Sequence, residues 1–113
     1  MLKLDKPQRI AYLKEIILES PDNPFGYYAL CLECESENQA DNTKSWLDLL
    51  ERFPLYLPSY YMAGKAFYEL GQKEKAITIW QKGLLLAKEQ GNNHTIAELK
   101  SAIQNALVDE DEN

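Results

Sequence analysis

The chain has 113 residues, of which 45% are apolar, and a formal net charge of −6 at pH 7. This length supports one domain with a modest core, and the apolar fraction excludes disorder of the whole chain. Basic residues are scattered rather than clustered, which disfavours nucleic acid as a partner. No apolar run approaches the ~18–20 residues that cross a bilayer, and residues 1–7 lack the apolar core of a signal peptide. We therefore expect a cytoplasmic protein without a membrane partner.

Six helices and no strand are predicted from the spacing of apolar residues and from the positions of proline and glycine. Pro7, Pro24 and Pro58 each stand at a helix start, where the missing N–H costs little. Pro21 and Pro54 follow helix ends. The predicted helices cover residues 7–19, 23–37, 42–53, 58–70, 73–89 and 93–108.

The first predicted helix places Ile10, Leu13 and Ile17 on one stripe, as a helix with one apolar face does. The second and third helices are joined by residues 38–42, which are rich in Asn and Asp. These residue types favour turns and helix caps. We expect the two helices to form a hairpin about this turn.

Two cysteines, Cys31 and Cys34, have the spacing of many zinc-binding and redox pairs. A structural zinc site needs four ligands, however, and the chain has no further cysteine and a single histidine, His94. A redox pair of the thioredoxin type follows a strand, whereas these cysteines lie within a predicted helix. Buried cysteine behaves as a small hydrophobe, and neighbouring glutamates tend to raise a thiol pKa. We therefore favour packing over a metal or redox role, with both thiols reduced and largely buried.

The segment 57–90 alternates small and large residues as a helix hairpin requires. Its pattern consists of Tyr60, Gly64 and Phe67 on the first helix, Gly71 at its end, and Ala76, Trp80 and Gly83 on the second. Small residues let two helix backbones approach closely, and a large ring fills the space one turn away. Trp80 is therefore predicted to be buried between the two helices.

The last predicted helix, 93–108, is apolar on one side only, which suits the open end of a helical stack. Its apolar stripe consists of Ile96, Leu99, Ile103 and Leu107. Residues 109–113 include four consecutive acidic side chains and are expected to form a disordered tail.

Motifs of catalysis are missing from the sequence: it has no Gly-rich phosphate loop, nucleophile elbow or His-Glu metal motif. Carboxylate pairs such as Asp48 and Glu51 are predicted on a solvated helix face. We therefore predict that the protein is not an enzyme and has no cofactor.

The order of residues in 57–90 resembles the tetratricopeptide repeat (TPR), whose signature is W-x2-L-G-x2-Y…A-x3-F…P with a period of 34 residues. Gly64, Phe67 and Ala76 match this signature directly. Four positions differ in residue type: Tyr60 stands for the Trp, Ala63 for the Leu, Trp80 for the Phe and Lys88 for the closing Pro. The chain resembles a small, bacterial member of this family.

The repeat recurs upstream in a degenerate form. Trp46 precedes Trp80 by 34 residues, and Pro54 closes the earlier unit as the family's Pro would. In that unit Asn42 or Thr43 occupies the family's Ala position. Cys31 and Cys34 occupy the positions of the family's Gly and aromatic residue.

The resemblance implies an all-α fold: a TPR-like right-handed superhelix of antiparallel helix hairpins, about six helices in all, with a C-terminal capping helix. It further implies one domain over residues 1–108. The parts of this domain are a half repeat at 7–20, repeats at about 23–54 and 57–90 and the capping helix at 93–108, with the acidic tail at 109–113.

The resemblance also implies a function, because the first helices of TPR hairpins line a concave groove that binds a peptide or protein. The groove-facing positions in this chain are Phe25, Tyr28, Leu32, Tyr61, Lys65 and Tyr68. We therefore expect a non-catalytic protein-binding scaffold. Of these positions only Lys65 suits an acidic chaperone tail, so that class of ligand is disfavoured.

Three alternatives remain open. The groove tyrosines could serve only to pack adjacent repeats. The chain could also self-associate through an uncovered flank of the first helix, near Ile10 and Leu13, although we expect a monomer or a weak homodimer. A metal or redox function of Cys31 and Cys34 is the third alternative.

Overall fold

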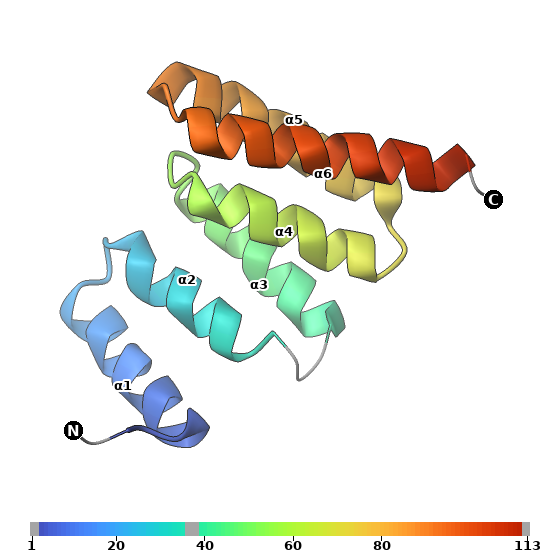
Figure 1. Cartoon of the computed structure of the whole chain (residues 1–113). Helices are drawn as coiled ribbons and strands as arrows, with labels where there is room; N and C mark the ends of the chain where they lie inside the picture. Colours follow the sequence, from blue (N-terminus) through green and yellow to red (C-terminus); the bar gives the residue numbers. More distant parts are fainter. Residues whose placement is uncertain (1–2, 36–38, 112–113) are drawn as a thin grey trace. The chain divides into compact units, whose positions relative to one another are not determined.

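The computed structural model describes residues 3–35 and 39–111, and these form six α-helices without a strand (Figure 1). The helices are α1 (Lys6–Glu19), α2 (Pro24–Glu33), α3 (Gln39–Arg52), α4 (Pro58–Glu69), α5 (Lys73–Gln90) and α6 (Asn93–Asp111). The prediction of an all-α fold is confirmed. No helix in the described part of the chain has both the length and the apolar character of a membrane span.

Most predicted helix ends agree with the structure to within one residue, but the junction of α2 and α3 differs. Cys34 is the C-cap of α2, so this helix stops before the predicted end at residue 37. Residues 36–38 lie outside the described part of the chain. The third helix starts at Gln39 rather than at residue 42, with Asp41 in its first turn. An acidic side chain there is favoured by the helix dipole, so residues that suit a turn can equally well begin a helix.

The chain divides into two compact units, one reaching to Phe53 and the other starting at Pro54. The first unit contains α1, α2 and α3, and the second contains α4, α5 and α6. The boundary coincides with the end of the earlier predicted repeat. That the two units form a single domain stays a prediction.

In the first unit α1 packs against α2, and α2 packs against α3. Leu13 of α1 is buried and Ile10 is half-buried. The prediction that α1 exposes a flank at these two residues is therefore wrong, because their stripe packs on α2. The exposed apolar side chains of α1 are instead Tyr12 and Leu18, which are 55% and 81% accessible.

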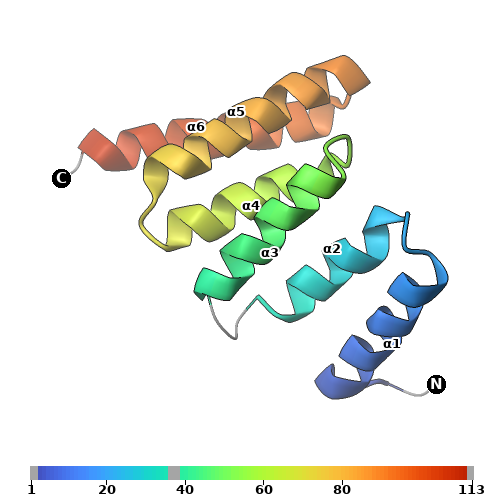
Figure 2. The same ribbon diagram turned by 180° about the vertical axis from the view of Figure 1, so that it is seen from behind.

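In the second unit α4 and α5 form an antiparallel hairpin and α6 packs along α5, as both views of the ribbon show (Figure 2). Trp80 is only 4% exposed, which confirms the predicted register of the hairpin. Gly71 ends the α4 side of the turn with a φ of 79°, a left-handed conformation that suits glycine. The hydroxyl of Tyr60 donates a hydrogen bond of 2.7 Å to the carbonyl oxygen of Pro54.

The last helix differs from its prediction at its C-terminal end. It continues to Asp111, so the residues from 109 to 111 are helical and do not belong to a disordered tail. No Gly or Pro interrupts this stretch, and a run of acids alone does not stop a helix. The buried side chains of α6 are Leu99 and Ala106. Leu107, which the sequence predicts on the apolar stripe, is 49% exposed.

Candidate functional site

Three predicted groove residues, Tyr61, Lys65 and Tyr68, lie half-buried along one side of α4. The ring of Tyr61 stacks on that of Trp80, with 6.5 Å between centroids and 28° between planes. The ring of Tyr68 lies 5.9 Å from the same indole, tilted by 34°. The indole N–H of Trp80 donates a 3.0 Å hydrogen bond to the carbonyl oxygen of Tyr61. Trp80 thus takes up part of the face that the sequence assigned to a ligand.

Tyr68 also connects α4 with α6. Its hydroxyl donates a hydrogen bond to the carboxylate of Asp109, a residue of the sequence-predicted tail. A carboxylate acceptor makes such a hydrogen bond stronger than a neutral one. The tyrosine is therefore fixed at both its ring and its hydroxyl, which reduces the conformational entropy lost when a partner packs against it.

The other predicted residues lie on α2, at i, i+3 and i+7 along one stripe. Phe25 and Leu32 are 54% and 38% exposed, and the half-buried ring of Tyr28 lies between them in sequence. Tyr28 meets the indole of Trp46 edge to face at 5.6 Å and 67°. Phe25, Tyr28 and Leu32 thus form an apolar stripe that faces solvent. Its central ring, that of Tyr28, is held in place by the T-shaped pair with Trp46.

The six predicted groove residues therefore form two sets, one on α2 in the first unit and one on α4 in the second. Within each set the structure brings the three residues onto one side of a helix. That both sets line a single groove stays a prediction.

The two cysteines lie at the end of α2 without a disulfide. Cys31 is buried and Cys34 is half-buried. Burial, and to a smaller extent the nearby Cys34 and Asp48, raise the pKa of Cys31 to about 11. A thiol in this state is a poor nucleophile at neutral pH. Among the described residues, no three potential metal ligands gather at one place.

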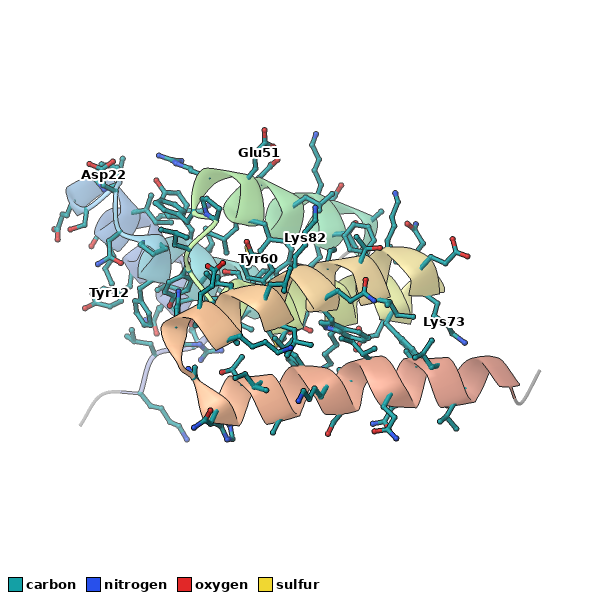
Figure 3. The ribbon with its side chains drawn as sticks, turned by 90° about the horizontal axis from the view of Figure 1, so that it is seen from above. Tyr12, Asp22, Glu51, Tyr60, Lys73 and Lys82 are labelled. Carbon is teal, nitrogen blue, oxygen red and sulfur yellow. The ribbon has the colours of Figure 1, made fainter. Side chains whose placement is uncertain are left out.

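A cavity of about 430 Å³ opens between α2 and α3 in the first unit. No feature of the sequence predicts this cavity as such. The polar residues on its α3 wall are Asp41, Asn42, Ser45, Asp48 and Arg52. Asp48 lines this cavity while it remains exposed, as its predicted place on a solvated helix face requires. Glu51 is also exposed and points away from the helix (Figure 3). The sequence carried one signal for this wall: four of its five residues recur at i, i+4, i+7 and i+11.

Comparison with solved structures finds similar chains. The solution structure of a tetratricopeptide repeat domain protein from Salinibacter ruber is 31% identical, with a TM-score of 0.71 over 77% of this chain and 89% of that one. A crystal structure of a tetratricopeptide repeat domain protein from the same organism is 30% identical, with a TM-score of 0.69 over 74% of this chain and 96% of that one.

A solution structure of a Bordetella parapertussis protein shares the fold at lower identity. Its TM-score is 0.76 at 19% identity, over 97% of this chain and 92% of that one. No protein-family model matches the sequence, and no curated protein matches it either.

Proposed function

This chain belongs to the tetratricopeptide repeat family, and we propose that it is a non-catalytic module that binds a peptide segment of a partner protein. The residues proposed to contact the partner are the stripe on α2 in the first unit and the tyrosine side of α4 in the second. Aromatic side chains on such helices give contact area at a low cost in entropy.

The observation that carries this proposal is the stripe on α2. Phe25 and Leu32 both lie on α2, and together they expose a substantial apolar area to solvent. Exposed apolar residues scattered singly need no explanation, but two of them beside a fixed aromatic ring form a patch. An apolar or aromatic side chain of a peptide would gain most of its binding energy at such a patch.

The experiment uses peptides selected from a display library against the whole chain. Affinity is then measured for Phe25→Ala and Leu32→Ser, with Leu85→Ser as the control. Leu85 is a matched control because it is 64% exposed on α5, outside the proposed surface. We expect the α2 variants to weaken binding by about tenfold or more, as for anchor residues, and the control to have no effect. Equal losses for Leu32→Ser and Leu85→Ser would contradict the proposed surface.

Lys65 tests the part of the surface on α4. Its charge would attract an acidic partner, so Lys65→Glu should weaken binding of an acidic peptide more at low salt than at high salt. An effect that is independent of salt would instead mean that Lys65 contributes by packing.

Self-association is a second candidate function, favoured by the exposed Leu18 and Tyr12 on α1. A second copy of the chain could cover them by a symmetric contact.

A further inference from the structure

The terminal turn of α6, residues 107–111, is helical although little of it is buried. Ala106, the residue before this turn, is buried. Within the turn, Leu107 and Val108 are 49% and 51% exposed, and Asp109 is exposed as well. Apolar burial therefore contributes little to holding the terminal turn on the rest of the second unit.

The charges of the terminal turn also disfavour a helix. Its sequence, Leu-Val-Asp-Glu-Asp, has three acidic residues and no basic one. The C-terminal end of a helix is the negative end of its dipole, so acidic side chains there are unfavourable. Helix ends that few contacts stabilise open easily. The terminal turn therefore depends on a tertiary contact to remain helical.

That contact comes from Tyr68 of α4, whose hydroxyl donates a hydrogen bond to the carboxylate of Asp109. The charge of the acceptor strengthens this bond. The ring of Tyr68 lies 5.9 Å from the indole of Trp80, which is buried in the hairpin. All three residues belong to the second unit, in which the C-terminal ends of α4 and α6 lie at the same end (Figure 1). The terminal turn is thus connected through Tyr68 to the core of the hairpin.

Tyr68 is also one of the residues proposed to contact the partner, so one side chain takes part in two contacts. A partner that packs on the ring restricts its orientation. Asp109 restricts the orientation of the hydroxyl on the same ring. Whichever contact forms first reduces the conformational entropy that the other must lose, which makes the two contacts cooperative.

We propose that Asp109 is a positioning residue for partner binding. The terminal turn of α6 orders Tyr68 for the partner, and the bound partner in turn orders the terminal turn. This coupling is reciprocal, because a coupling free energy acts equally on both contacts. The inference rests on the proposed function, since it requires that the partner contacts Tyr68. It goes beyond that function by giving a role to the end of α6, which lies outside the proposed binding surface.

The contact is tested first in the free chain by amide hydrogen exchange. Tyr68→Phe removes the hydroxyl and leaves the sequence of α6 unchanged, so a change of exchange in the terminal turn must come through the contact. Tyr61→Phe is the matched control, because it removes the hydroxyl of the other tyrosine whose ring meets Trp80. We expect exchange at residues 107–111 to become several-fold faster in Tyr68→Phe and to stay unchanged in Tyr61→Phe. Equal rates in the two variants would overturn the proposal.

The affinity for a display-selected peptide tests whether the contact influences the partner. Tyr68→Phe keeps the ring, and Asp109→Ala removes the acceptor; each should weaken binding by about fivefold, the lower end of typical coupling between sites. The double variant should bind as weakly as either single variant, because both changes break the same contact. Glu98→Ala, which removes an exposed carboxylate earlier in α6, should leave the affinity unchanged. Losses that multiply in the double variant would mean that the two residues act independently, which would overturn the proposal.

The reciprocal effect is measured by hydrogen exchange in the presence of saturating peptide. Exchange in the terminal turn should become slower in the wild type and should not respond to the peptide in Tyr68→Phe. A terminal turn that exchanges at the same rate with and without peptide in the wild type would overturn the coupling.

Tyr68→Ala distinguishes a failure of this inference from a failure of the proposed function. If Tyr68→Ala leaves the affinity unchanged, the α4 part of the binding surface is wrong and the coupling is overturned with it. If Tyr68→Ala weakens binding whereas Tyr68→Phe and Asp109→Ala do not, the binding surface stands and only the role of Asp109 is overturned.

Discussion

The indole of Trp80 lies directly against the α-carbon of Gly64. A Cβ atom at position 64 would overlap Nε1 of this indole and would lie 2.5 Å from its Cδ1 and 2.6 Å from its Cε2. The indole cannot easily move aside, because its N–H is bonded to Tyr61 and its faces meet Tyr61 and Tyr68. The close approach of α4 to α5 therefore depends on the contact between Gly64 and Trp80.

Gly64→Ala should destabilise the protein. Overpacking costs about 1–3 kcal/mol, which exceeds the gain of up to ~1 kcal/mol in helix propensity. Denaturant unfolding measures the net loss. The same substitution should cost less in a Trp80→Phe background, where the smaller ring leaves room for the methyl group. An equal cost in the two backgrounds would show that Gly64 and Trp80 are not coupled.

Trp80→Ala should lower the free energy of unfolding by about 3–5 kcal/mol, because it removes a large buried side chain and leaves a cavity. That loss is a large part of the ~5–15 kcal/mol that an ordinary domain has. Tyr12→Ala, at a position 55% exposed, serves as the control and should have little effect. If the Trp80 variant melts within a few degrees of the wild type, the assigned core is wrong.

The Cys31 thiol should make stability depend on pH. Its pKa is raised from 9.0 to about 11 in the folded state, so the folded chain holds its proton more tightly than the unfolded chain. This contribution is fully present below pH 9 and is lost as the pH rises toward 11; at most it is about 3 kcal/mol. Denaturant unfolding of Cys31→Ala should therefore show a smaller loss of stability over this range than the wild type. Parallel curves would contradict the raised pKa.

Light scattering should show a monomer or a weak dimer. If a dimer forms through α1, Leu18→Asp should shift it to monomer by placing a charge in the contact. Leu55→Asp is the matched control, since Leu55 is 72% exposed in the other unit. A tight dimer that survives Leu18→Asp would rule out the α1 flank as its interface.

The hairpin of α4 and α5 could be predicted from the sequence because its signal is local. Gly64 and Trp80 lie on neighbouring helices joined by a short turn, so the spacing of small and large residues determines their contact. The start of α3 could not be fixed in this way, because Asn and Asp suit a turn, a cap and a first helical turn alike.

The cavity could not be predicted because periodicity assigns residues to helix faces but does not show where two faces fail to meet. In the earlier unit Asn42 and Thr43 stand near the position of the family's Ala, and both are buried. Asn42 brings a longer, polar side chain to a position where the family packs a methyl group. The degeneracy of the repeat was visible in the sequence, but its consequence for packing required the structure.

The binding surface is tested most directly by mapping chemical-shift changes when a display-selected peptide is added to the labelled chain. We expect the largest changes on α2 around Phe25, Tyr28 and Leu32 and on α4 around Tyr61, Lys65 and Tyr68. Changes concentrated on α3 and α5, with these six residues unaffected, would place the partner on other helices and would contradict the proposed surface.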